Sequence, residues 1–250
     1  GLQEEHFEMS DHAFKVDFPA NLLSMNAYFN ITPSIQFSPQ FQEDTLPVQL
    51  ISNQMTAYKI SCFNQEAFAD SNYIFPNNKR MTLSFIYNPL DFLNQVYEDL
   101  SVFAVYRWED KYKKWIHQPS FINQELNIVQ AEVNRMGIYG LFRNMDKIQP
   151  SIDVNVEGQE FSTGSYISGN GVLSFLFSDA NGIDILDNKI SMFLNGVPVD
   201  DKAFAISAVP GYLNQVPMKY KLSLLKGNYT ISISCTDVNG INRIKTFDFK

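Results

Sequence analysis

The sequence predicts an all-β protein made of two consecutive β-sandwich domains. Aromatic residues are abundant, with 21 Phe and 12 Tyr among 250 residues, and large aromatic side chains favour the half-buried surface of a sheet. Short runs of alternating apolar and polar residues recur along the chain and end at turn residues. A polar, Pro-containing linker at residues 146–151 separates two series of these runs, as expected at a domain boundary.

The first domain is predicted to span residues 14–147, after an N-terminal extension at 1–13 that we expect to be mobile. Its clearest strand is 81–87, where Met81, Leu83, Phe85 and Tyr87 fall on one face. A short helical turn is expected within 93–100, because apolar residues there recur at helical spacing. The other predicted strands cover 13–18, 27–31 (stopped by Pro33), 48–51, 58–63, 100–108, 128–133 and 137–142.

The second domain is predicted to span residues 148–250. Its expected strands lie at 152–156, 172–177, 189–194, 219–224, 229–235 and 244–249. Strands about ten residues apart, joined by turns that contain Gly or Asn, are typical of an immunoglobulin-like sandwich. Two similar segments, 179–184 and 237–242, each contain Asn-Gly, which supplies the positive φ of a tight turn without any ligand.

Charge and hydropathy disfavour several classes of partner. The net charge is −8, and the one dense basic run, at 111–114, is too small for binding to nucleic acid or to anionic lipid headgroups. No apolar stretch approaches the ~20 residues of a membrane helix. The two cysteines, Cys62 and Cys235, are expected to be buried thiols rather than a disulfide.

The sequence predicts no catalytic site and no cofactor. The three histidines are scattered at His6, His12 and His117, and no Gly-x-Ser-x-Gly motif accompanies them. Pairing Cys62 with His117 would give a nucleophile and a base, but nothing in the sequence positions the two together.

One acidic segment is a candidate metal site. Asp179, Asn181, Asp184 and Asp187 offer the hard oxygen ligands that Ca²⁺ prefers. Their spacing departs from that of an EF-hand loop, since Gly182 comes too early and no Glu closes the loop. We therefore favour a turn that holds no ion.

A second candidate site is aromatic. Tyr and Trp gather between Arg107 and Trp115, and Trp, Tyr and Arg dominate the energetics of protein interfaces. The sequence therefore proposes Trp108, Arg107 and Tyr112 as partner-binding residues, and it places Trp115 in the core. The same aromatic side chains could instead stack on a sugar ring.

The first domain contains the segments Val16-Asp-Phe-Pro-Ala-Asn-Leu-Leu, Ala57-Tyr-Lys-Ile, Met81-Thr-Leu-Ser-Phe-Ile-Tyr and Leu100-Ser-Val-Phe-Ala-Val-Tyr-Arg. Further along the chain are Trp115, Asn127-Ile-Val-Gln-Ala-Glu-Val and Gly137-Ile-Tyr-Gly-Leu. In these segments the domain resembles the ZU5-related β-sandwich modules of large bacterial surface proteins.

The second domain is similar to the Ig-like modules of Bacteroidota surface proteins and of type IX secretion peptidases. The segments that carry this likeness are Pro150-Ser-Ile-Asp-Val-Asn-Val, Phe161-Ser-Thr-Gly, Asp179-Ala-Asn-Gly-Ile-Asp and Leu194-Asn-Gly, followed by Leu225-Lys-Gly-Asn-Tyr and Asp237-Val-Asn-Gly.

Together these resemblances imply a non-catalytic binding or scaffold segment of a bacterial surface or secreted protein. It would act through contacts with a protein of the cell envelope or of a larger assembly, in association with type IX secretion. The alternatives are a carbohydrate-binding module, with a glycan as partner, and an accessory region of a secreted peptidase. The expected location is the cell surface, the outer membrane or the medium.

Three positions are candidates for glycosylation. Asn30 and Asn228 stand in Asn-x-Thr motifs, which often occur by chance. Thr45, in Asp44-Thr-Leu, resembles the O-glycosylation motif of Bacteroidota surface proteins. For Thr45 an ordinary polar loop is an equally good interpretation.

Overall fold

The computed structural model describes residues 4–10, 12–23, 28–34, 48–50 (backbone only), 57–63, 73–88, 102–159, 161–209 and 212–250. The predicted all-β class is confirmed, because the described elements are antiparallel strands and short 3-10 turns. The helical turn expected within 93–100 lies outside the described residues. Contacts divide the chain into two compact units, residues 1–108 with 115–146 and residues 109–114 with 147–250. The two domains expected from the sequence meet at 147–148.

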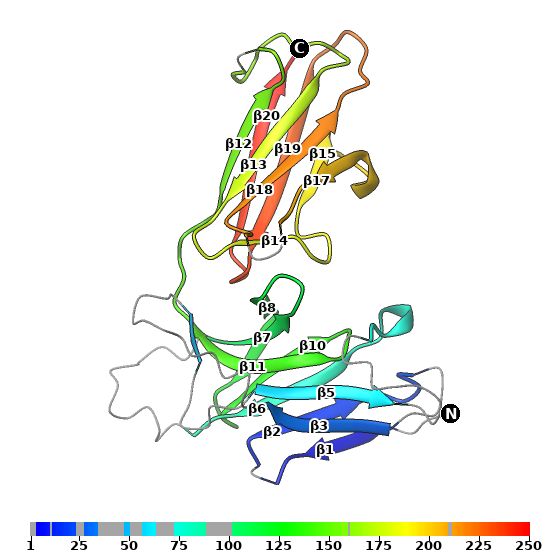
Figure 1. Ribbon diagram of the computed structural model, residues 1–250, viewed down its shortest axis with the longest axis vertical. Helices are drawn as coiled ribbons and strands as arrows, with labels where there is room; N and C mark the ends of the chain where they lie inside the picture. The colour runs from blue at the N-terminus through cyan, green and yellow to red at the C-terminus, as the bar shows by residue number, and fades with distance from the viewer. Residues whose placement is uncertain are drawn as a thin grey trace. The chain divides into compact units, whose positions relative to one another are not determined.

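The first unit contains two antiparallel sheets. One has the strand order β1-β2-β6-β10-β9 and comprises β1 (Glu5–Glu8), β2 (Phe14–Phe18), β6 (Met81–Ile86), β10 (Ile128–Val133) and β9 (Ser120–Asn123). The other has the order β3-β5-β11-β7-β8, with β4 also paired to β11. Its strands are β3 (Tyr28–Ser34), β4 (Val48–Leu50), β5 (Ala57–Phe63), β7 (Phe103–Glu109), β8 (Lys114–Gln118) and β11 (Gly137–Asn144), many of them labelled in Figure 1.

Aromatic side chains join these two sheets into a sandwich. Phe14 of β2 stacks on Tyr58 of β5, with ring centroids 4.3 Å apart. Phe18 of β2 stacks on Phe29 of β3 at 3.8 Å. The alternation predicted at 81–87 is present, since Met81, Leu83 and Phe85 are all buried in the same cluster. The many aromatic residues of this sequence therefore form the core between the sheets.

Two predictions about this unit are wrong. Residues 5–8 are part of the sheet as β1, paired with β2 from Glu5↔Phe18 to Glu8↔Lys15, rather than part of a mobile extension. The strand expected to stop at Pro33 continues to Ser34 as β3. Among the described residues, β3 is an edge strand and pairs only with β5. An edge strand tolerates the missing N–H of Pro33, because its outer side makes no ladder hydrogen bonds.

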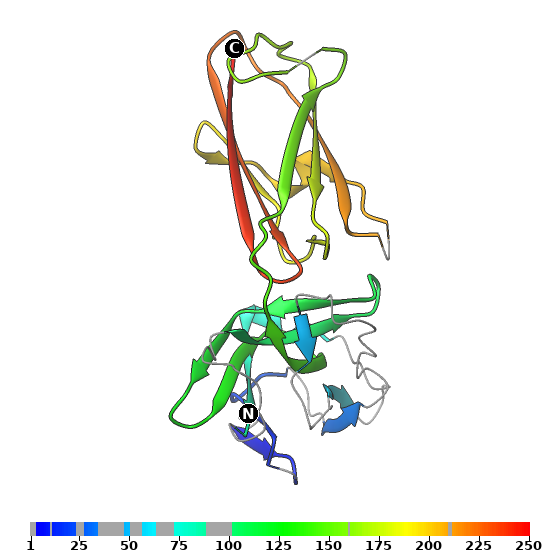
Figure 2. The same ribbon diagram turned by 90° about the vertical axis from the view of Figure 1, so that its left-hand side faces the viewer.

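The second unit also contains two antiparallel sheets, which Figures 1 and 2 show as separate layers. One has the order β12-β13-β18-β17, with β12 at Ser151–Val156, β13 at Val172–Ser178, β17 at Phe204–Ile206 and β18 at Gln215–Lys221. The other has the order β14-β19-β15-β16, with β20 paired to β19. Its strands are β14 (Ile183–Asp184), β15 (Ser191–Leu194), β16 (Val197–Pro198), β19 (Tyr229–Asp237) and β20 (Asn242–Phe249).

Alternating side chains from both layers fill the core of the second unit. In β13, Leu173, Phe175 and Phe177 point inward while the residues between them are only partly buried. Ile231 and Ile233 of β19 belong to the same hydrophobic cluster. This arrangement is that of a two-layer sandwich, in which every second residue of each strand faces the opposite sheet.

The strand predicted at 219–224 lies earlier in the chain, as β18 at Gln215–Lys221. Pro217 conceals it in the sequence, since Pro usually interrupts an interior strand. The neighbouring strand β17 pairs only with residues 218–220. Pro217 lies opposite Leu176 of β13, and on its other side, just past the end of β17, its carbonyl accepts a hydrogen bond from Ser207 N at 2.9 Å, which needs no N–H from Pro217.

Candidate functional site

The two edge strands of the five-stranded sheet in the first unit differ in chemistry. This difference identifies the candidate functional site. At one end lies β9, which pairs with β10 from Asn123↔Ile128 to Ser120↔Ala131. Its sequence Ser-Phe-Ile-Asn has no charged residue, and Phe121 is 65% exposed. An edge strand presents backbone N–H and C=O groups to which another strand can add. An exposed, uncharged edge with a large aromatic side chain favours such addition.

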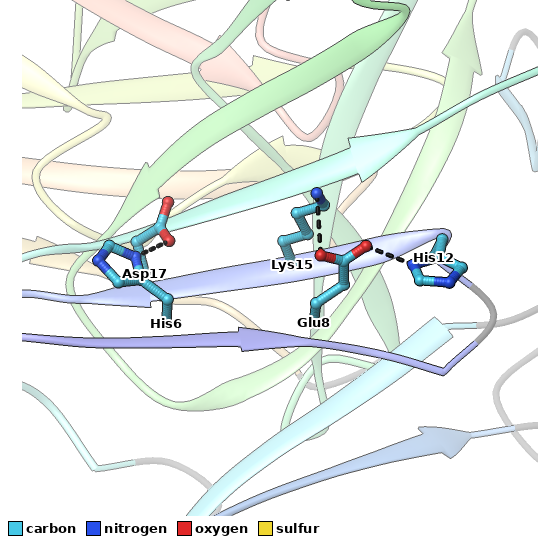
Figure 3. Close-up of polar contacts among 5 residues, drawn as sticks. All are labelled: His6, Glu8, His12, Lys15 and Asp17. Atoms are coloured by element: carbon cyan, nitrogen blue, oxygen red, sulfur yellow. Dashed lines mark hydrogen bonds and ion pairs between the residues drawn. The ribbon is translucent and has the colours of Figure 1, made fainter.

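At the other end lies β1, whose exposed side chains are mostly charged. Figure 3 shows two groups of contacts, in which His6 and Glu8 of β1 meet Asp17 and Lys15 of β2 and His12 of the turn between the two strands. His6 Nδ1 lies 2.6 Å from Asp17 Oδ1. Glu8 interacts with His12 through Oε1 at 2.5 Å and with Lys15 through Oε2 at 3.0 Å. Charged side chains on an edge strand discourage the addition of a further strand.

These contacts shift the protonation of the groups involved. The hydrogen bond with Asp17 raises the pKa of His6 above its ordinary value. Hydrogen bonds with His12 and then with Lys15 lower the pKa of Glu8. Both shifts favour the charged forms, so ion pairing reinforces the charge of this edge.

Phe7 is the apolar exception in β1, and it has a structural role. Its ring meets that of Phe18 edge-on, with centroids 5.7 Å apart, and it lies 6.5 Å from the ring of Phe29. These two rings come from the two different sheets. Phe7 therefore closes this side of the sandwich, and its 39% exposed surface is the outer side of a packed ring.

The residues proposed as an aromatic partner-binding site occupy different environments. Arg107 is 3% exposed and Tyr112 is 5% exposed, so neither offers the free surface that an anchoring side chain needs. The Arg107 stem lies over Gly137, where an added Cβ would come within 3.5 Å of its Cγ and Cδ. Trp108 is half-buried, and its contact with a partner stays a prediction.

Trp115 is buried at 9% exposure, in keeping with the core position proposed for it. Its ring meets Trp108 edge-on at 5.6 Å and lies 4.7 Å from the ring of Phe142. The strand pattern explains this packing. In β7, Ala104 and Tyr106 point to the small cluster that contains Trp115, and Trp108 continues the same face.

The acidic segment at 179–187 forms turns in which its carboxylates accept backbone hydrogen bonds. Asp179 Oδ1 accepts from Asn181 N at 2.7 Å and from Gly182 N at 3.2 Å. Asp184 Oδ1 accepts from Leu186 N at 3.0 Å. Asp187 is exposed in a turn with φ 48°. Within the described part of the chain, neither Asp184 nor Asp187 belongs to a cluster of three metal-ligating side chains.

The second copy of this motif has the same local design. Asp237 Oδ1 accepts from Asn239 N at 2.9 Å and from Ile241 N at 2.8 Å. The two turns lie side by side, because Asp237 pairs with Ile183 and Val238 N donates to Gly182 O. Carboxylate oxygens of Asp179 and Asp237 lie within 4.8 Å of each other. The repeated motif thus builds two adjoining turns at one end of the second unit.

The two cysteines are free and buried. Burial first, and then the charges of Asp237 and Asp179, raise the pKa of the Cys235 thiol to about 12. The protonated thiol is a poor nucleophile. Of the candidate glycosylation positions, Asn30 lies on β3 and Asn228 in the exposed loop before β19, while Thr45 lies outside the described residues.

Sequence patterns did not identify β9, because Pro119 precedes it and its four residues are too few to show alternation. The signal that could have found it is its turn. Asn123 Oδ1 accepts a hydrogen bond from Leu126 N, and Asn127 has φ 56°. Two Asn residues placed just before the strong strand at 128–133 are typical of a hairpin.

Comparison with known proteins establishes no family for this chain. No protein-family model matches it, and no curated protein sequence matches it. Among solved structures it is similar to dimeric latent PorU from Porphyromonas gingivalis, with a TM-score of 0.36 and 10% identity. The match covers 78% of this chain and 21% of PorU, so the chain spans about a fifth of the length of that protein. A TM-score of this size establishes neither a common fold nor a common function. Among the described residues, no helix is long and apolar enough to cross a membrane.

Proposed function

We propose that this chain is a non-catalytic binding or scaffold segment of a bacterial surface or secreted protein, associated with type IX secretion. It acts through contacts with another protein of the cell envelope or of a larger assembly. The finer assignment, a ZU5-like module followed by an Ig-like module, is supported by the sequence resemblances and by the two-layer form of each unit.

The observation that carries the proposal is the uncharged edge at β9. Phe121 exposes 65% of its surface on a strand that ends its sheet among the described residues. At the opposite edge, the charged side chains of β1 discourage the addition of another strand. A partner strand that adds to β9 gains main-chain hydrogen bonds, and Phe121 provides an apolar anchor.

The non-catalytic part of the proposal is supported by the surroundings of the reactive side chains. His6 and His12 form exposed ion pairs with carboxylates. Cys235 is held in its protonated form. Hydrolytic turnover by the 250-residue chain, abolished by one point substitution, would contradict this part.

Site-specific photo-crosslinking tests the binding surface. A benzoylphenylalanine at position 121 should form an adduct with one defined protein in the source cells, whereas the same group at Glu5 of β1 should not. Added purified chain should compete for the adduct, and chain that carries Phe121→Lys should compete at least about tenfold less well, as expected for an aromatic anchor. Equal adducts at both edges, or full competition by Phe121→Lys, would exclude β9 as the contact strand.

A further inference from the structure

The second unit has a hollow at the end opposite the two Asp-containing turns. Its volume is about 540 Å³, within the range of about 300–1,000 Å³ that is typical of small-molecule sites. It lies between the loop that precedes β13, the loop that precedes β19 and the end of β20, near the C label in Figure 1. Its described lining includes Tyr166, Leu225, Lys226, Asn228, Tyr229 and Lys250.

Packing and backbone hydrogen bonds fix the shape of this hollow. Gly169 approaches Leu224 so closely that a Cβ on Gly169 would overlap the Leu224 carbonyl oxygen, and Leu224 N donates to Gly169 O at 2.9 Å. Ile167 N donates to Lys250 O at the same distance. The two loops and the last strand are therefore tied together, as a preformed site requires.

An aromatic pair supports the inner wall. The ring of Tyr229 stacks on that of Phe249, with centroids 5.7 Å apart and an interplanar angle of 22°. Gly227 lies against the Tyr229 ring, and Tyr229 Oη donates to Leu225 O at 2.9 Å. The hydroxyl thus fixes the loop that forms the rim.

The rim combines an exposed ring with positive charge. Tyr166 is 78% exposed, and Lys250 Nζ lies 5.5 Å from its ring centroid. Lys226 adds a second ammonium group, and Asn228 adds an amide that can both donate and accept hydrogen bonds. No Asp or Glu side chain is among the described residues that line the hollow, and the one carboxylate there in the 250-residue chain is the α-carboxylate of Lys250, against two ammonium groups. Since the whole chain carries a net charge of −8, this local excess of cations favours an anionic ligand.

We propose that this hollow binds an acidic saccharide, a short oligosaccharide that contains a uronic acid. The apolar C–H face of a sugar ring packs on Tyr166, the sugar carboxylate pairs with Lys226 and Lys250, and the hydroxyl groups bond to Asn228. The inference goes beyond the proposed function, because it concerns another ligand class and another unit.

Backbone pairing argues for a saccharide rather than a peptide. An extended peptide binds mainly by main-chain hydrogen bonds to an open strand edge. At this rim, backbone groups of Ile167, Gly169 and Leu224 are already bonded within the rim itself. The groups that remain suited to recognition are the aromatic, ammonium and amide side chains.

Calorimetric titration of the 250-residue chain with oligogalacturonate and with hyaluronan oligosaccharides tests the proposal. Binding should weaken about tenfold or more in Tyr166→Ala, as for an aromatic hot spot. Lys226→Gln and Lys250→Gln should each weaken binding several-fold and reduce its dependence on salt. The methyl ester of oligogalacturonate has the same rings without the charge. It should bind the unmodified chain as weakly as oligogalacturonate binds a variant that carries both Lys226→Gln and Lys250→Gln.

Two matched variants control for exposure and charge. Tyr28→Ala removes a tyrosine that is 62% exposed in the first unit, and Lys202→Gln removes a lysine that does not line the hollow. Both should bind as the unmodified chain does, and melting curves should show that every variant is folded. No binding to either uronate oligosaccharide, equal binding of the methyl ester, or tighter binding of an oligoglutamate peptide would each overturn the proposal. None of these results bears on the β9 edge, which Phe121→Lys tests separately.

Discussion

Among the described residues, β1 and β9 are the two edge strands of the same five-stranded sheet, yet they expose opposite kinds of surface. On β1, Glu5, His6 and Glu8 point to solvent, and the one large apolar side chain, Phe7, packs against rings of both sheets. On β9, no residue is charged and Phe121 is largely exposed. An exposed Phe on an edge strand therefore has to be judged by what its ring contacts and by the charges around it.

The largest expected difference between the edges is in stability. Phe7→Ala should lower the free energy of unfolding of the first unit by about 2 kcal/mol, less than for a fully buried Phe because Phe7 is partly exposed. Phe121→Ala should change it by less than about 0.5 kcal/mol, since most of that ring is already in water.

Trp108 and Trp115, the two tryptophans of the chain, both belong to the first unit. Their fluorescence during urea unfolding measures this unit. Equal losses for the two substitutions would remove the distinction between a packing ring and a free one.

Exchanging the chemistry of the edges should change association. A triple variant of β1, Glu5→Thr with His6→Val and Glu8→Thr, replaces charged residues with strand-forming neutral ones. We expect its mean mass in sedimentation experiments to rise with concentration more steeply than that of the unmodified chain, because an uncharged edge permits pairing between chains. The control is a triple variant with Lys at the same three positions, which stays charged and should match the unmodified chain. If the neutral variant matches it as well, charge is not what protects β1.

The strands that the sequence predicts well are those buried on one face. In 81–87, Met81, Leu83 and Phe85 lie on the face that meets the core, and β6 lies there. Of the residues that alternate with them, Thr82 and Ile86 are only partly buried, while Ser84 is buried as well. Leu173, Phe175 and Phe177 of β13 likewise face the core. At these positions the alternation of apolar and polar residues in the sequence predicts which side chains are buried.

The edge strands, which form the candidate site, escape this kind of prediction. In β1 only Phe7 contacts the core, so no alternation marks the strand. In β9, Ile122 is the one apolar residue packed against the cluster. Burial of Arg107 beside Gly137 likewise depends on pairing between distant strands, since Tyr139 of β11 lies opposite Arg107. Such contacts are properties of the assembled sheet.

The resistance of the β1 amides to hydrogen exchange should depend on pH, while that of the β9 amides should not. The folded-state pKa of His6 lies above its ordinary 6.5. The stability that His6 contributes is therefore fully present below pH 6.5 and is lost as pH rises through the folded-state pKa. The folded-state pKa of Glu8 lies below its ordinary 4.5, so its contribution is present above 4.5 and is lost as pH falls.

Both contributions coexist between pH 4.5 and 6.5. Hydrogen exchange of the β1 amides, corrected for intrinsic rates, should be slowest relative to that of β9 in this window. The charged groups that face these two residues are Asp17 and Glu4 for His6, and His12 and Lys15 for Glu8. A ratio that stays constant from pH 4 to 8 would show that these ion pairs leave the pairing of β1 unaffected.

The smallest effect should come from removing a single partner at the charged edge. Asp17→Asn keeps the shape of the side chain but removes the carboxylate 2.6 Å from His6 Nδ1. The pKa of His6, read from its ring proton shifts in an NMR titration, should then fall back toward 6.5, because its largest cause is the hydrogen bond with Asp17. The melting temperature should stay within about 1 °C, since exposed ion pairs contribute little to stability. The unmodified chain, titrated under the same conditions, is the reference. If the pKa of His6 is unchanged, the contact with Asp17 does not persist in solution.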